Sequence, residues 1–233
     1  MKKTNNNNTT ELVFILDRSG SMAGLEADTI GGFNSLINKQ KMIDGRCYVS
    51  TVLFDSECEV IHDRVPLEKV RPITEREYWV RGCTALVDAI GGAVHHIGNI
   101  HKYARRSDVP AHTMFVIMTD GMENASHIYS LAKVKKMIEQ QENKYGWEFL
   151  FIGANIDSIS TAESFGIRAE NAADYYADSE GTGIVFDCVA DACYSMQSDG
   201  TLPKEWSNPI SDDYKSKNNR CNLNLHKKVL FIS

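Results

Sequence analysis

The chain has 233 residues, 42% of them hydrophobic and 24% charged, with a formal net charge of −6. That length suits a single α/β domain with a sizeable core. The negative charge argues against nucleic acid as a partner, because phosphate binding needs clustered Lys and Arg. No apolar run is long enough to cross a bilayer, so we expect no membrane partner either.

Two further features concern the cellular setting. The first residues lack the apolar stretch of a signal peptide, so we expect a cytoplasmic protein. The six cysteines include no Cys-x-x-Cys pair; they stand at positions 47, 58, 83, 188, 193 and 221. In a reducing cytosol they are expected to be buried or idle thiols, and their spacing argues against a zinc site.

The first part of the chain alternates predicted strands and helix. Residues 1–10 are rich in Asn and Thr, and we expect them to form a disordered lead-in. The continuous apolar run over 12–16 is typical of a strand buried on both faces, and helical spacing predicts an amphipathic helix over 28–42. Strands are predicted over 47–54 and 57–67, joined as an antiparallel hairpin at one edge of the sheet.

The second part continues the alternation. A short helical piece is expected after Pro72, and a longer helix begins directly after Thr84. Apolar residues at helical spacing, from Ile128 to Ile138, predict another helix. The remaining predicted elements, in chain order, are strands over 113–118 and 147–152 and helices over 158–165 and 182–196.

This alternation implies βαβ units, and therefore an α/β fold with a mostly parallel sheet, one antiparallel edge strand and helices on both faces. We assign the domain to residues 11–196. Residues 197–233 are polar and contain Pro203 and Pro209, so we expect an irregular C-terminal extension in which only 228–233 resembles a strand.

Oxygen-bearing side chains stand in three loops of this predicted fold. The first predicted strand ends in a loop that holds Asp17, Ser19 and Ser21. Thr84 lies directly before a predicted helix, and Asp120 directly after a later strand. Ligand sites of parallel sheets lie beyond the carboxyl ends of the strands, so the three loops can meet at one edge. All five groups are hard oxygen ligands, which suit Mg²⁺, Mn²⁺ or Ca²⁺.

The mixture of charged and neutral groups favours one of these ions. Three of the five candidates are neutral hydroxyls, so a bound cation would keep much of its charge. Mg²⁺ commonly binds with few protein carboxylates and leaves positions for an outside ligand. The sequence therefore predicts a Mg²⁺ site, with Mn²⁺ or Ca²⁺ as alternatives, whose vacant position fits a carboxylate from a partner protein.

These residues resemble the metal-ion-dependent adhesion site (MIDAS) of von Willebrand factor A-type (vWA) domains. The resemblance is carried by Asp17-Arg18-Ser19-Gly20-Ser21-Met22, by Thr84 in a Gly-x-Thr loop and by Asp120-Gly121 after an apolar strand. It covers residues 11–196 and implies a Rossmann-like fold. It also implies direct metal contacts from the three hydroxyls, that of Thr84 depending on state, and contacts mostly through water from the two carboxylates.

A narrower resemblance points to bacterial cytosolic vWA proteins found near tellurite-resistance and stress-response proteins. It rests on the loop sequences and on Glu180-Gly181-Thr182-Gly183 at the start of the last predicted helix. The implied function is metal-dependent binding of a partner that supplies an Asp or Glu carboxylate. The sequence leaves the oligomeric state open.

Two other functions are alternatives. A Mg²⁺-dependent hydrolase, such as a phosphatase, usually has a second carboxylate two residues after the first, where this chain has Ser19. That hydroxyl is a weak nucleophile without an adjacent base, so we expect no enzyme. A nucleotide-binding protein would need a Gly-rich phosphate loop, which the first loop lacks.

Neighbouring polar residues have simpler interpretations. Glu123 and Asn124 follow the third loop and could tune the site, but Asn124 or Ser126 is expected to cap the next helix. Asp88 is expected to interact favourably with its helix N-terminus. Acidic side chains of the tail could instead occupy the open metal position in cis; the candidates are Glu205, Asp212 and Asp213.

Overall fold

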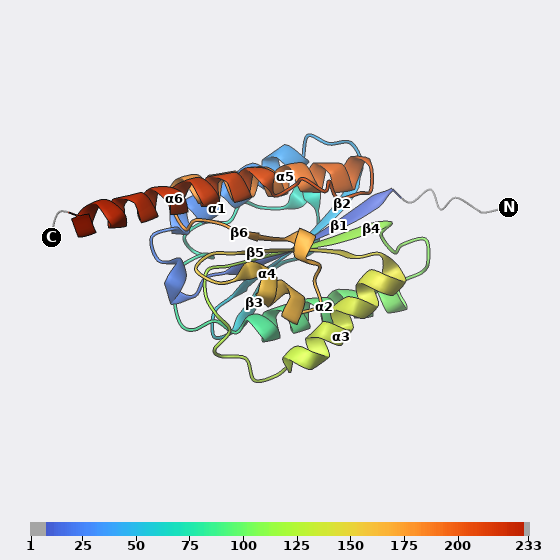
Figure 1. The fold of residues 1–233 in the computed structure, drawn as a ribbon. Coiled ribbons are helices and arrows are strands. Elements are labelled where there is room, and N and C mark those ends of the chain that lie inside the picture. Colours follow the sequence, from blue (N-terminus) through green and yellow to red (C-terminus); the bar gives the residue numbers. More distant parts are fainter. Residues whose placement is uncertain (1–7, 231–233) are drawn as a thin grey trace.

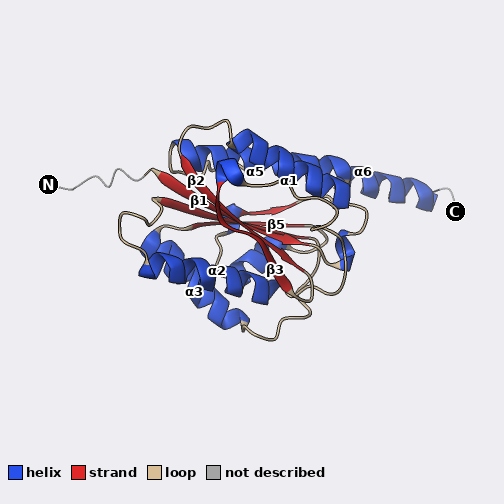
Figure 2. Cartoon of the chain, turned by 180° about the vertical axis from the view of Figure 1, so that it is seen from behind, coloured by secondary structure: helices blue, strands red, loops and turns tan. Residues whose placement is uncertain are grey.

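The computed structural model describes residues 8–230, with side chains through residue 219. A central sheet is covered by helices on both faces (Figures 1 and 2). Its strands are β1 (Thr9–Asp17), β2 (Arg46–Phe54), β3 (Cys58–Pro66), β4 (His112–Thr119), β5 (Glu148–Gly153) and β6 (Ala172–Asp174).

The sheet has the order β3-β2-β1-β4-β5-β6. Every pairing is parallel except that of β3 with β2, which is antiparallel. The predicted α/β fold, mostly parallel with one antiparallel edge strand, is therefore confirmed. The three-residue strand β6 was not predicted. Strand order reverses between β1 and β4, which is where parallel α/β sheets place their ligands.

The helices divide between the two faces. One face carries α1, α5 and α6, and the other carries α2, α3 and α4 (Figure 1). Their bounds are α1 (Glu26–Gln40), α2 (Leu86–Tyr103), α3 (Leu131–Tyr145), α4 (Ser158–Ser164), α5 (Ser179–Ser198) and α6 (Asn208–Leu230). Within the described residues, no helix is both long and apolar enough to cross a membrane.

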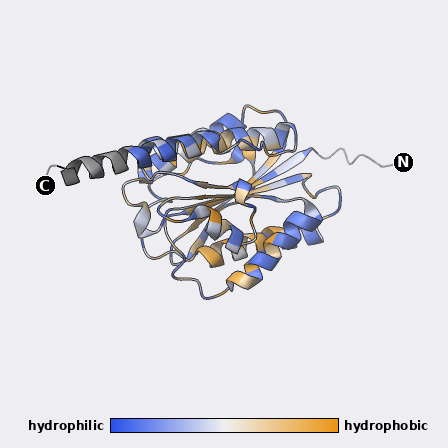
Figure 3. Ribbon diagram, in the orientation of Figure 1, coloured by the Kyte–Doolittle hydropathy of each residue, from blue (hydrophilic) through white to orange (hydrophobic). Residues whose placement is uncertain are grey.

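Alternating side chains of the central strands fill both cores. In β1, Leu12, Phe14 and Leu16 pack beneath α1 and α5, whereas Val13 and Ile15 pack against α2 and α3. All five are almost completely buried. In Figure 3 apolar colour accordingly runs along the central strands, whereas α3 carries both hydrophilic and apolar colour. This two-sided burial explains the continuous apolar runs in the sequence.

Two elements differ from the sequence-based expectation near the site. Ile128 does not belong to α3; it is 69% exposed in the loop before it, and its backbone N–H donates to Asp88. After Pro72 the chain makes only a turn, in which the Tyr78 N–H donates to the Thr74 carbonyl.

The expected disordered lead-in does not extend through residue 10. Thr9 and Thr10 are buried in β1, where they pair with Arg46 and Cys47 of β2. These polar residues can be buried because β1 pairs with both β2 and β4, so its backbone N–H and C=O groups have hydrogen-bond partners. Residues 1–7 lie outside the described residues.

The C-terminal extension is not irregular, because residues 208–230 form the long helix α6. Pro209 is the second residue of that helix, where its missing N–H removes no intrahelical hydrogen bond. Trp206 and Ile210 are buried in the core beside α5, and the Trp206 indole donates to the Glu170 carbonyl. The expected strand-like segment 228–233 is helical through 230, and 231–233 are not described.

Lys217 fastens α6 to the start of α5. Its ammonium lies 2.9 Å from Asp178 Oδ1, 3.2 Å from Glu180 Oε2 and 2.9 Å from Asp213 Oδ2. The lysine side chain is only 12% exposed, and Asp178 also caps α5 by accepting from the Gly181 N–H. Asp213, one of the tail carboxylates considered above, is thus bound to Lys217.

We predict that Lys217→Met loosens α6 and the first turn of α5. Amide hydrogen exchange of residues 208–217 and 178–182 should accelerate on the order of tenfold, because a charge-assisted hydrogen bond contributes roughly 1.5–3 kcal/mol. Lys215→Met is the matched control, since Lys215 is exposed on the same helix. Equal exchange in the two variants would contradict the prediction.

Candidate metal centre

The three loops singled out in the sequence meet at the carboxyl edge of the sheet. Asp17 is the last residue of β1, and Asp120 directly follows the neighbouring strand β4. Both therefore stand at the point where strand order reverses. Thr84 lies two residues before α2.

Hydrogen bonds fix the first loop around Asp17. Its Oδ1 accepts from the Ser19 N–H at 2.6 Å, and its Oδ2 accepts from the Thr119 hydroxyl at 2.6 Å. The Ser19 and Ser21 hydroxyl oxygens lie 2.9 Å apart. The buried Tyr78 hydroxyl donates to the Asp17 carbonyl at 2.5 Å. Asp17 is thus held by residues from three segments, with Ser19 and Thr119 on its carboxylate and Tyr78 on its main-chain carbonyl.

Gly121 is the point where the hydroxyls of two loops converge. A Cβ placed on this glycine would lie 3.1 Å from Ser21 Oγ and 3.1 Å from Thr84 Oγ1. Ser21 is exposed, whereas Ser19 and Thr84 are buried. The five predicted residues therefore lie together at this edge of the sheet, with Ser21 exposed to solvent.

The two carboxylates are held in an environment that disfavours their charge. Burial raises the pKa of Asp17 and of Asp120, and for Asp120 the charge of Asp17 adds to the effect. Asp120 Oδ1 is buried and has no hydrogen-bond partner. A cation placed beside it would supply the missing partner and offset the repulsion.

The donor set fits a hard divalent cation. Among residues 8–219, no group of three or more His, Cys, Asp and Glu side chains could hold a metal ion. The present centre is of a different kind, with two carboxylates and three hydroxyls drawn from the predicted residues. Hydroxyl and carboxylate oxygens suit Mg²⁺, Mn²⁺ and Ca²⁺. The residues present therefore fit such an ion.

Arg18 anchors the first loop through a buried side chain, a role that the sequence did not predict. Its side chain is 1% exposed; its Nε donates to Asp55 Oδ2 at 2.9 Å, and its Nη1 to Glu59 Oε2 at 2.7 Å. Nη1 also donates to the Glu77 carbonyl. An arginine in a polar loop, between Asp17 and Ser19, would ordinarily be taken for a solvent-exposed residue.

Backbone bonds connect the first and second loops. The Arg81 N–H donates to the Arg18 carbonyl at 2.9 Å, and the Gly20 N–H to the Gly82 carbonyl at 3.3 Å. The Arg81 side chain shares Asp55 Oδ2 with Arg18, at 2.8 Å. Burial opposes ionisation of Asp55, but hydrogen bonds from these arginines and the Glu57 N–H hold its pKa below the usual value.

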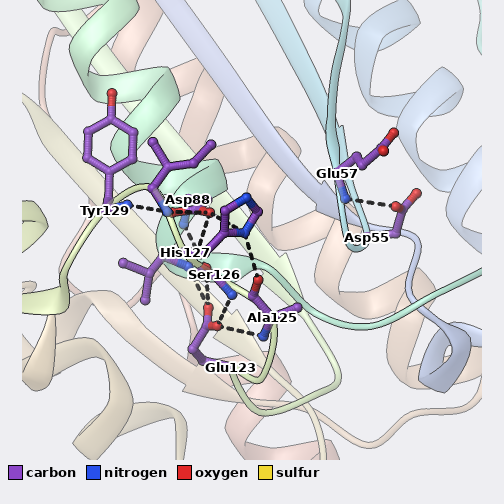
Figure 4. A network of polar contacts seen from close by, with 10 residues as sticks. Asp55, Glu57, Asp88, Glu123, Ala125, Ser126, His127 and Tyr129 are labelled. Atoms are coloured by element: carbon purple, nitrogen blue, oxygen red, sulfur yellow. Dashed lines mark hydrogen bonds and ion pairs between the residues drawn. The ribbon is translucent and has the colours of Figure 1, made fainter.

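A second polar network connects α2 to the loop after β4 (Figure 4). Asp88, on the first turn of α2, accepts from the backbone N–H groups of His127, Ile128 and Tyr129. Burial opposes ionisation of Asp88, but these three bonds outweigh it and lower its pKa. Asp88 therefore binds the next loop, beyond its expected interaction with its own helix.

The expected caps of α3 are also different. Ser130 is the N-cap of α3 and accepts from the Lys133 N–H. Asn124 instead contacts Thr84, and Ser126 accepts from the Asp88 N–H at 2.9 Å. The local sequence does not predict these pairings, because they join residues far apart in the chain.

Comparisons with known proteins locate this fold among solved structures. No known protein family matches the sequence, and no curated protein is significantly similar to it. Similar structures include a von Willebrand factor type A protein from Catenulispora acidiphila, with 12% identity over 80% of this chain and a TM-score of 0.54. Proximal thread matrix protein 1 from the mussel byssus, with a zinc-occupied MIDAS motif, matches with 12% identity over 80% and a TM-score of 0.53.

A third similar structure is the manganese-loaded TRAP protein of Plasmodium vivax. It has 18% identity over 73% of this chain and a TM-score of 0.51, and the match covers 70% of that protein. The chain spans only 43% of the Catenulispora protein and 46% of the mussel protein. Identities this low establish the fold alone. The chain thus has the Rossmann-like fold of von Willebrand A domains.

Proposed function

We propose that this chain is a divalent-metal-dependent protein-binding module. Asp17, Ser19, Ser21, Thr84 and Asp120 would hold the ion, and its open position would take an Asp or Glu carboxylate from a partner protein. The observation that carries the proposal is the cradle around Gly121, where hydroxyls from two loops approach beside the unpartnered Asp120 Oδ1. The ion would supply the positive charge that attracts the partner.

The donor set supports binding rather than catalysis. Ser19 is buried and contacts Ser21, and it stands where a hydrolase of this kind would have its second carboxylate. Exposed Ser21 leaves the solvent side open to an incoming group. We propose Mg²⁺ as the resident ion, because few carboxylates and open positions suit its chemistry. The mussel and Plasmodium structures contain zinc and manganese, respectively.

The proposed setting is the cytoplasm, without a nucleic-acid or membrane partner. The net charge of −6 supports the first exclusion. The described cysteines are all free, which fits a reducing compartment. The narrower relation to bacterial stress-response proteins is likewise a proposal, supported by the loop sequences.

We predict that Gly121→Ala weakens Mg²⁺ binding roughly 10–100-fold, the range found when groups that orient metal ligands are disturbed. The added methyl group would lie 3.1 Å from both the Ser21 and Thr84 hydroxyl oxygens and would push them apart. Titration calorimetry measures the affinity. Gly92→Ala is the control, because a Cβ on Gly92 of α2 meets open space. Unchanged affinity in Gly121→Ala would mean that the hydroxyls do not converge on a metal.

Asp120→Asn should stabilise the metal-free protein but abolish its stabilisation by Mg²⁺. Asp120 is 3% exposed, lies near Asp17 and has an unpartnered oxygen, so the neutral amide should raise the melting temperature of the metal-free protein. Saturating Mg²⁺ should then stabilise only the wild type, by about 2.7 kcal/mol at 100 times Kd. Calorimetric melting with and without Mg²⁺ tests both; equal stabilisation of the two proteins argues against this centre.

Partner binding itself is tested by capture from the lysate of the native host. Wild type in Mg²⁺ should retain a protein that is lost in EDTA and lost with Ser19→Ala, which removes one hydroxyl while keeping the loop. Mass spectrometry identifies the retained protein. Identical captures in all three samples would count against metal-bridged binding, and phosphate release from generic substrates would then test the hydrolase alternative.

A further inference from the structure

Asn124 binds the backbone of Thr84 from both sides. Its Oδ1 accepts from the Thr84 N–H at 2.8 Å, and its own N–H donates to the Thr84 carbonyl at 3.0 Å. Thr84 belongs to the loop before α2, whereas Asn124 follows β4 on the segment that begins with Asp120. One residue of the third loop therefore fixes the main chain at the proposed metal residue of the second.

Glu123, the preceding residue, attaches the same segment to α2. Its Oε2 accepts from the Val87 N–H at 2.8 Å and from the Ser126 hydroxyl at 2.7 Å. Its Oε1 accepts from the N–H groups of Ala125 and Ser126. Figure 4 shows this carboxylate directed into the loop, below the Asp88 network.

The backbone N–H groups at the N-terminus of α2 find their acceptors in another loop. Its N-cap, Ala85, has no side chain able to accept from the first-turn amides. A local Ser, Thr or Asp at that position would cap the helix without contacting any other loop. The acceptors come instead from Glu123 and Ser126, on the loop after β4. Capping α2 and aligning the second and third loops are therefore one and the same set of contacts.

We propose that Asn124 is a positioning residue of the metal centre. It sets the Thr84 hydroxyl at the cradle beside Asp120, with Glu123 holding the segment on which Asn124 stands. This inference rests on the proposed metal function. Asn124 makes no contact with the ion in this proposal; it acts through Thr84.

The experiment measures Mg²⁺ affinity by titration calorimetry, together with melting of the metal-free protein. Asn124→Ala should weaken Mg²⁺ binding about tenfold, within the range for residues that orient metal ligands. Asn124→Asp keeps an acceptor for the Thr84 N–H and should restore binding to within about twofold of wild type, on the same reasoning. If Asn124→Ala does not fold, Asn124→Ser, with its shorter side chain, takes its place.

Two controls separate positioning from general stability. Ser130→Ala removes the N-cap of α3 on the same segment, and should lower the melting temperature without changing Mg²⁺ affinity. In a Thr84→Ala background, Asn124→Ala should have no further effect on affinity, because residues that act through one another are not additive.

The outcomes distinguish this inference from the proposed function. If wild type binds Mg²⁺ and Asn124→Ala melts lower but binds equally well, Asn124 is only structural and the inference is wrong. An effect of Asn124→Ala that persists undiminished without the Thr84 hydroxyl also overturns it. If wild type takes up no Mg²⁺, the metal centre itself fails.

Discussion

The site depends on two buried carboxylates that end adjacent parallel strands. The register of β1 with β4 brings Asp17 and Asp120 to one edge, where burial raises the pKa of both groups and the charge of Asp17 adds to the effect at Asp120. Hydrogen bonds from Thr119 and Ser19 satisfy Asp17, but Asp120 Oδ1 has no partner. A fold that keeps such a pair uncompensated is destabilised, and positive charge is the natural compensation. The surrounding loops hold these two carboxylates in place beside the three hydroxyls.

Each of the three loops is connected to the other two by hydrogen bonds, so none of them can move independently. Arg18 and Gly20 connect the first loop to the second, Asn124 connects the second to the third, and Thr119 connects the end of β4 back to Asp17. Ligands on loops are placed accurately only when other groups restrict the loops. Here the restricting groups include a fully buried arginine and carboxylates that accept several backbone N–H groups each, all of them outside the proposed ligand set.

The sequence predicted what depends on local pattern. Continuous apolar runs identified the buried strands, and the loops after β1 and β4 supplied the candidate oxygen groups because parallel strands share a carboxyl edge. It failed where a residue's role depends on distant partners. Arg18 is buried only because Asp55 and Glu59 face it, and Ile128 stays outside α3 because Asp88 binds its N–H. Pro209 was taken for a helix breaker, although one position inside a helix start is where proline is tolerated.

The long helix α6 carries the end of the described chain past the carboxyl edge of the sheet. It starts near Glu170, before β6, and reaches the carboxyl edge at Lys217, which binds the start of α5. Residues 218–230 then continue past that edge for about 20 Å, while β1 begins at the opposite end of the molecule (Figure 1). A surface or reporter joined ahead of β1 would therefore leave the edge with the proposed metal residues facing outward, whereas the same group joined after α6 would lie on the side of that edge.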